Sequence, residues 1–99
     1  MKTVIETPTF TYQAGKIWTE ENKDEFINFI SSDPTAGDLI TNSGGARKVR
    51  WKSKKGAGKS GGVRVITITE TEDAVTLIAI YRKSQVTTIK GHEIKEMNK

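Results

Sequence analysis

Two apolar runs separated by a short polar segment constrain the fold of this chain more than any other feature. Residues 63–69, VRVITIT, and residues 75–83, VTLIAIYRK, are rich in the β-branched side chains that favour strands. The segment between them, ETEDA, is typical of a tight polar turn. Because the second run is the most apolar stretch of the sequence, we expect it to form an interior strand of a sheet.

The segment RKVRWKS at 47–53 predicts another strand, with two different faces. Side chains alternate along a strand, so Arg47, Val49, Trp51 and Ser53 point one way and Lys48, Arg50, Lys52 and Lys54 the other. We expect the first set to pack on helices and the second to make the opposite face open and basic. Like charges side by side repel, so this row favours an anion-binding surface over a purely structural role.

The first third of the sequence predicts one short strand and two helices. Residues 3–6 read as a strand that Pro8 ends, and residues 9–18 as a weakly helical segment with Phe10, Tyr12, Ile17 and Trp18 as anchors. A clearer helix begins after the N-cap residue Thr19 and ends at Asp33-Pro34, since a residue before proline is disfavoured in a helix. Residues 35–46 read as a connecting loop. We therefore expect a single α+β domain over 1–99, with two N-terminal helices packed on a small, mainly antiparallel, twisted sheet.

The basic residues are concentrated in the middle of the chain. The net charge is only +4, but residues 39–69 contain no Asp or Glu and hold eight of the 16 Lys and Arg residues. Such a one-sided distribution attracts polyanions such as RNA or DNA. The alternative is a solvated face that keeps the protein soluble.

The stretch GAGKSGG at 56–62 contains Gly58-Lys59-Ser60 in the order of a phosphate-binding loop. The full motif needs a further glycine where this chain has Ser53, and it must open a helix. Here a strand-like run follows, so the backbone N–H groups of a helix N-terminus are not expected. We interpret the stretch as a glycine-rich turn between two strands.

The remaining composition narrows the protein class. The sequence has no cysteine, which excludes disulfides and cysteine-based zinc sites. The first ten residues carry no apolar signal core, and no stretch approaches the length of a membrane span. We expect a cytoplasmic protein with no membrane partner.

An ordered set of motifs resembles the RelE/ParE superfamily of toxins from type II toxin–antitoxin pairs, and within it the HigB-like branch. The motifs are Gly37-Asp38-x-Ile40, Gly44-Gly45-x-Arg47-Lys48-x-Arg50, Gly58-Lys59-x-Gly61-Gly62-x-Arg64-Val65-Ile66 and Ile80-Tyr81-x-Lys83. They span residues 36–84, about half of the chain. The resemblance implies the α+β fold expected above, with GAGKSGG as the turn that presents Lys59 and leads into Arg64.

The resemblance also implies an activity, the ribosome-dependent cleavage of mRNA without a metal or any other cofactor. In such toxins the 2′-hydroxyl attacks the adjacent phosphate and leaves a cyclic phosphate and a free 5′-hydroxyl. This chemistry needs a base, an acid and cations that stabilise the charge of the transition state. The resemblance places these roles on Arg64, Lys83, Tyr81, Lys59 and Lys54. It places RNA binding on Lys48, Arg50, Lys52, Lys55 and Arg82.

The resemblance also implies individual roles, with Lys54 and Lys59 holding phosphate, and the residue types support them. Arg64 stays charged and suits stabilisation of the transition state, while Lys83 and Tyr81 suit proton transfer or substrate orientation. Tyr81 could instead stack on a base. The structural alternatives are a salt bridge of Arg64 to Glu70 or Asp73, and a sheet aromatic at Tyr81.

Partners follow from the resemblance as well. We expect a cognate antitoxin with a helix-turn-helix DNA-binding part, the 70S ribosome with its mRNA, and operator DNA only through the antitoxin complex. Two other functions stay open, namely a ParE-like poison of DNA gyrase and a basic RNA- or DNA-binding module without catalysis. The second gains weight from Thr67-Ile68-Thr69, where relatives often carry aromatic residues.

Overall fold

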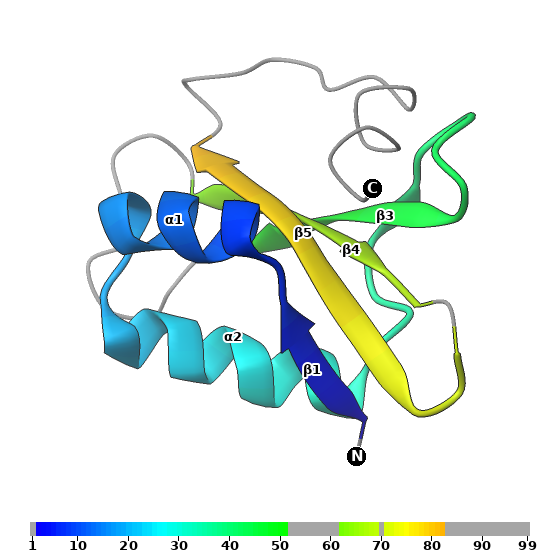
Figure 1. Cartoon of the computed structure of the whole chain (residues 1–99), viewed down its shortest axis with the longest axis horizontal. Helices are drawn as coiled ribbons and strands as arrows, with labels where there is room; N and C mark the ends of the chain where they lie inside the picture. The colour runs from blue at the N-terminus through cyan, green and yellow to red at the C-terminus, as the bar shows by residue number, and fades with distance from the viewer. Residues whose placement is uncertain (1, 52–61, 70, 83–99) are drawn as a thin grey trace.

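The computed structural model describes residues 2–51, 62–69 and 71–82. The elements in chain order are β1 (Thr3–Glu6), α1 (Pro8–Ile17), α2 (Glu20–Ser32), β2 (Asp38–Leu39), β3 (Ala46–Trp51), β4 (Val63–Ile68) and β5 (Ala74–Arg82). The strands form one sheet in the order β1-β5-β4-β3-β2 (Figure 1). The expected α+β fold, with two N-terminal helices and a small sheet, is confirmed.

The sheet is antiparallel except at one edge. There β1 runs parallel to β5, with Thr3 opposite Ala74 and Glu6 opposite Leu77. The prediction of an interior strand at 75–83 is confirmed, because β5 lies between β1 and β4. No described helix is long and apolar enough to cross a membrane, since the two helices have 10 and 13 residues.

The short edge strand β2 was not predicted from the sequence. It pairs with β3 through Asp38 opposite Lys48 and Leu39 opposite Arg47, within the segment expected to be a loop. Gly37 makes this approach possible. Its φ is 97°, and a Cβ there would lie 2.6 Å from the Lys48 carbonyl oxygen.

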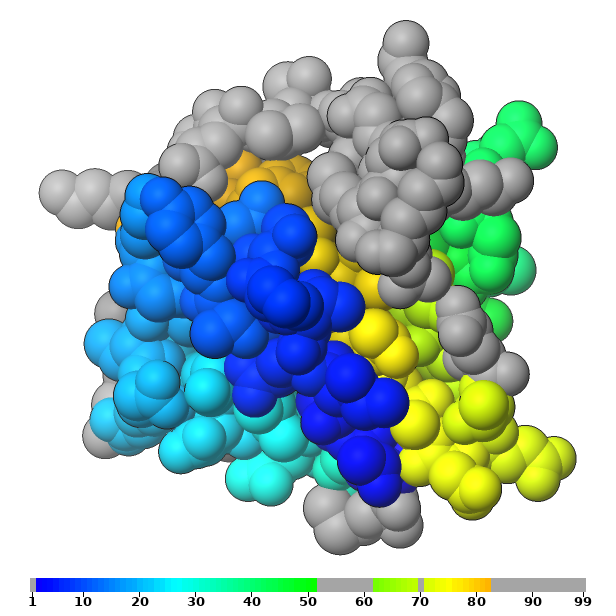
Figure 2. Space-filling model, viewed as in Figure 1, coloured from blue at the N-terminus to red at the C-terminus, as the bar shows by residue number. Residues whose placement is uncertain are grey.

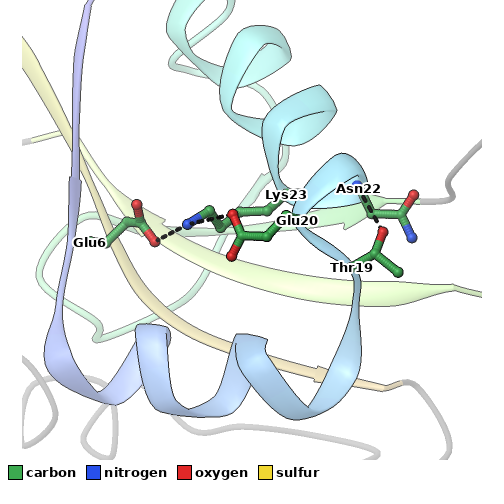
Figure 3. Close-up of polar contacts among 5 residues, drawn as sticks. All are labelled: Glu6, Thr19, Glu20, Asn22 and Lys23. Carbon is green, nitrogen blue, oxygen red and sulfur yellow. Dashed lines mark hydrogen bonds and ion pairs between the residues drawn. The ribbon is translucent and has the colours of Figure 1, made fainter.

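Both helices begin at threonine N-caps. Thr7 Oγ1 accepts the Phe10 N–H at 3.2 Å, and Pro8 occupies the first helical turn, where its missing N–H costs nothing. Thr19 Oγ1 accepts the Asn22 N–H at 3.2 Å, as expected for the second helix (Figure 3).

One cation ties α2 to β1. Lys23 Nζ lies 3.5 Å from Glu6 Oε1 and 3.5 Å from Glu20 Oε2, so a lysine of α2 reaches a carboxylate of β1 (Figure 3). Burial alone would lower the pKa of Lys23, but the two carboxylates outweigh it and the pKa is raised. The ammonium group therefore stays charged throughout the neutral range.

The main core lies between the helices and one face of the sheet. Phe10 and Ala14 of α1 and Phe26 and Ile30 of α2 pack on that face, and all four are buried. The sheet contributes Val49, Val65, Val75, Leu77 and Ile80. An aromatic series runs through this core, with Phe26 between Trp18 (5.6 Å between ring centroids) and Trp51 (5.4 Å). Tyr12, expected as an anchor, is instead 67% exposed.

The opposite face of the sheet corrects one expectation. It was predicted to be open and basic, but it carries a second buried apolar cluster of Ala46, Ile66, Ile68, Ile78, Ala79 and Tyr81. The prediction failed because it was drawn from β3 alone. β4 and β5 place isoleucines on this face, and these are as fully buried as the helix-side core. Cations and buried apolar residues share the face.

Candidate functional site

The candidate site is a row of side chains across three neighbouring strands. Arg64 of β4 lies opposite Arg50 of β3 on one side and Tyr81 of β5 on the other. Directly opposed residues of antiparallel strands have Cβ atoms about 4.5–5.5 Å apart, so the two guanidinium stems are neighbours. All three residues belong to the sheet face away from the helices.

Lys48 extends the row along β3. It is two residues before Arg50 and therefore on the same face, about 7 Å away along the strand. The alternation predicted for Lys48 and Arg50 against Val49 and Trp51 is thus confirmed where the structure describes it. Three cations lie together with a phenol beside the second apolar cluster, and Asp38 of β2 lies opposite Lys48.

The side chain of Tyr81 is buried in this face of the sheet. Only 7% of its surface is exposed, and burial raises the pKa of its phenol while the positive charge of Arg64 partly offsets the rise. A ring so covered offers no open face for base stacking. The structural alternative, a sheet aromatic at Tyr81, is therefore confirmed, since the ring belongs to the second apolar cluster. Of the two chemical roles expected for Tyr81, donation of a proton or hydrogen bond fits this environment better than stacking.

Arg64 does not use its charge to pair with Asp73. Asp73 precedes β5 at Ala74, whereas Arg64 lies opposite Tyr81 near the far end of the strand, roughly 25 Å away. Arg64 Nη1 instead donates to its neighbouring Val63 carbonyl at 3.3 Å. The Asp73 alternative is therefore wrong, and Glu70 lies outside the described residues.

Arg82 is not brought to this face. Its register partner is Val63, and its Nη2 donates to the Ile17 carbonyl oxygen at the end of α1, at 3.3 Å. Both contacts place Arg82 on the helix side of the sheet. Its predicted role in RNA binding would need a surface separate from that of Arg64.

Five predicted site residues lie outside the described residues. They are Lys52, Lys54, Lys55, Lys59 and Lys83. The candidate site is therefore built from Lys48, Arg50, Arg64 and Tyr81 alone.

The elements on either side of GAGKSGG decide whether it can be a phosphate-binding loop. Trp51 and Val63 are register partners in an antiparallel pair, and β4 begins directly after Gly62. A strand, not a helix, follows the stretch, so the N-terminal dipole and N–H groups of a nucleotide-binding loop are missing at this position. The stretch connects two antiparallel strands, as expected.

Thr67, Ile68 and Thr69, where relatives often carry aromatic residues, have structural contacts in this fold. Thr67 is fully buried, Ile68 belongs to the second apolar cluster, and Thr69 Oγ1 donates to the Pro34 carbonyl at 2.9 Å. Thr67 and Ile68 end β4 and Thr69 follows it, on the side away from Arg64. They serve packing and loop attachment here.

Other concave regions lie away from this row. One of them, of about 470 Å³, is lined by Lys2, Ser31, Ser32, Pro34, Glu72 and Asp73, and its two carboxylates do not suit a polyanion. A cavity of about 60 Å³ between β1, α1 and α2 is lined by Glu6, Trp18, Glu20 and Lys23, among others. That volume holds one or two waters and no nucleotide. Within the described ranges, no group of three His, Asp or Glu side chains could hold a metal ion.

Sequence reasoning missed the relationship that defines the site. It identified Arg50, Arg64 and Tyr81 one strand at a time, but the register that places them in one row depends on pairing between strands. The raised pKa of Tyr81 was missed as well, because the face was expected to be open. No protein-family model matches the sequence.

Proposed function

We propose that this protein is a toxin of the RelE/ParE kind that cleaves mRNA on the ribosome, paired with a cognate antitoxin. The observation that carries the proposal is the row Arg50–Arg64–Tyr81. Two guanidinium groups directly opposite each other destabilise a sheet, and an anion between them relieves the repulsion. A phosphodiester is such an anion, and the neighbouring phenol supplies a donor.

The chemistry can be assigned to individual residues as follows. The 2′-oxygen forms a bond to phosphorus and gives its proton to a base. The resemblance offers Lys83 for proton transfer or substrate orientation, and we assign the base role to it. Arg64 stabilises the charge that grows on the phosphoryl oxygens. The bond from phosphorus to the 5′-oxygen breaks, and Tyr81 donates its proton to that oxygen. The products are a 2′,3′-cyclic phosphate and a 5′-hydroxyl.

The state of Tyr81 supports the acid role. Its raised pKa keeps the phenol protonated at neutral pH, so it cannot serve as the base there. Arg64 beside it keeps the pKa from rising further, because a positive charge favours the phenolate that forms when the proton leaves.

The test is cleavage of mRNA in a reconstituted bacterial translation system, mapped by primer extension. Wild type is compared with Arg64→Ala, Arg64→Lys, Tyr81→Phe and the control Arg47→Ala. Arg47 lies in the same strand as Arg50 but points to the helix side, where its Nη1 donates to the Gly37 carbonyl at 3.2 Å. We expect new codon-phased 5′ ends from wild type and Arg47→Ala, and a loss of about 10²–10³-fold in rate for Arg64→Ala.

The outcomes separate the three functions. Cleavage that is lost with Arg64 supports the nuclease, and products bearing a 5′-hydroxyl support the cyclising route. Intact mRNA in this system, together with growth arrest when the protein is induced in bacteria, would reject it in favour of another target such as DNA gyrase. Salt-sensitive RNA binding without cleavage would indicate a binding module.

A further inference from the structure

Strand β5 contains one residue more than its partner. Arg64 pairs with Tyr81 and Ile66 with Ala79, but the next residue, Thr67, pairs with Leu77. Ile78 is therefore an extra residue, a β-bulge in β5.

The bulge decides which way Tyr81 points. Leu77 packs in the helix-side core, and strict alternation would return residues 79 and 81 to that same side. Instead Ile78 and Ala79 both lie in the second cluster, Ile80 returns to the helix side, and Tyr81 joins Arg64. If the same sequence ran as a regular strand with no bulge, Tyr81 would point into the helices.

Helix α1 and its N-cap Thr7 bond backbone groups of β5 next to the bulge, on the side that β1 leaves uncovered. β1 ends at Glu6 opposite Leu77, so it offers nothing to the part of β5 beyond that point. Gln13 Oε1 accepts the Ile80 N–H at 3.0 Å, and Thr7 Oγ1 donates to the carbonyls of Leu77 at 2.9 Å and Ile78 at 3.2 Å. In Figure 2 the atoms of α1 lie directly against those of β5.

We propose that Gln13, with Thr7, is a positioning residue for Tyr81: it holds the bulge that turns the tyrosine towards Arg64. The inference rests on the proposed function only in so far as Tyr81 takes part in cleavage. The two residues do not touch the site face. They act through the backbone of Leu77, Ile78 and Ile80.

The experiment measures the position of Tyr81 without RNA. Gln13→Met removes the acceptor at similar length, Gln13→Glu retains an oxygen acceptor, and Ile17→Val is a control that perturbs α1 packing elsewhere. All are made in Tyr12→Phe protein, so that Tyr81 is the one remaining tyrosine. Amide exchange of Ile80 is followed by NMR, and phenolate formation by absorbance against pH.

We expect Gln13→Met to accelerate exchange of the Ile80 amide roughly tenfold, because its hydrogen bond is lost. The pKa of Tyr81 should fall towards its ordinary value, since the ring leaves its buried position. Gln13→Glu should retain the wild-type exchange, and Ile17→Val should change neither quantity. Unchanged exchange and titration in Gln13→Met would overturn the inference. If Gln13→Met does not fold, Gln13→Asn is measured in its place. Its side chain is one methylene shorter, so its oxygen no longer reaches the Ile80 N–H.

Activity supplies a second, separable readout. Gln13→Met should slow cleavage as Tyr81→Phe does, and the double variant should be no slower than Tyr81→Phe alone, since both act on one group. A wild type that cleaves nothing would reject the proposed function while the exchange and titration results still decide the role of Gln13. Additive losses in an active enzyme would reject the positioning role alone.

Discussion

Arg64 and Tyr81 lie directly opposite each other on β4 and β5. The charge of Arg64 and the burial of Tyr81 shift the pKa of the phenol in opposite directions. Burial raises the pKa of Tyr81, and the charge of Arg64 lowers it. Replacing Arg64 by methionine should therefore raise the pKa of Tyr81 further, because burial is left unopposed. Phenolate absorbance in Tyr12→Phe protein measures the shift. Arg47→Met, on the other face, should leave it unchanged; an equal shift in both variants would contradict the pairing.

The fold should lose stability in alkali. The pKa values of Lys23 and Tyr81 are both raised above their ordinary values of 10.5 and 10.0, so each group holds its proton more tightly when folded. Their contributions are complete below about pH 10 and disappear as pH rises through the folded pKa values. Urea unfolding from neutral to strongly alkaline pH should show a flat free energy of unfolding that declines above about pH 10. Lys23→Met combined with Tyr81→Phe should flatten the decline, and an unchanged decline would implicate other groups.

Phe26 should be the costliest aromatic to remove. It is fully buried between Trp18 and Trp51, so Phe26→Ala leaves a cavity and should cost about 3–5 kcal/mol in free energy of unfolding. Phe29, which is 36% exposed, provides the matched control and should cost clearly less. Tryptophan fluorescence during urea unfolding reports both variants. Equal costs would show that the aromatic series is not centred on Phe26.

Two glycine-to-alanine substitutions should change the stability of the protein in opposite directions. Gly15 is helical, and a Cβ added to it would meet nothing within 4 Å, so Gly15→Ala should stabilise the protein by about 0.5–1 kcal/mol. Gly37→Ala should destabilise it by roughly 1–3 kcal/mol, because the positive φ and the Lys48 carbonyl both oppose a Cβ. Thermal unfolding of the two variants measures both effects, and a neutral Gly37→Ala would contradict the close approach of β2 and β3.

Arg50 should oppose folding while it favours RNA binding. Threonine is a good strand residue and removes the charge opposite Arg64, so Arg50→Thr should raise the free energy of unfolding by about 0.2–1 kcal/mol. The gain should shrink with added salt, since the repulsion is screened. RNA affinity, measured by filter binding, should fall at the same time. Arg47→Thr is the control, and a loss of stability in Arg50→Thr would remove the argument for a strained cationic row.

Local patterns predicted most of the elements. Thr19 and Asp33-Pro34 bounded α2, and the alternation of Lys48 to Trp51 assigned β3 to its two faces. These signals are contained within a few neighbouring residues. The propensities of single residues decide them, and no distant contact overrides them.

Three features could not be predicted because they arise from distant contacts. Strand β2 needs a partner in β3, and Tyr81 is buried among the isoleucines of β4 and β5. The bulge at Ile78 lies beside hydrogen bonds from Thr7 and Gln13, far away in the sequence. The alternation rule fails at the bulge for this reason. A side chain 67 positions away along the chain accepts the Ile80 N–H, and no periodicity in the strand could reveal it.

The parallel pairing of β1 with β5 has a consequence for how the protein is made. Thr3 pairs with Ala74, so β1 can pair with its neighbour in the sheet only after β5 has been synthesised. Synthesis proceeds at about 5–20 residues per second, so for several seconds α1 exists without β5 to pack against. Until residue 82 has been added, a nascent chain also lacks the arrangement of Arg64 and Tyr81, because that arrangement needs β5.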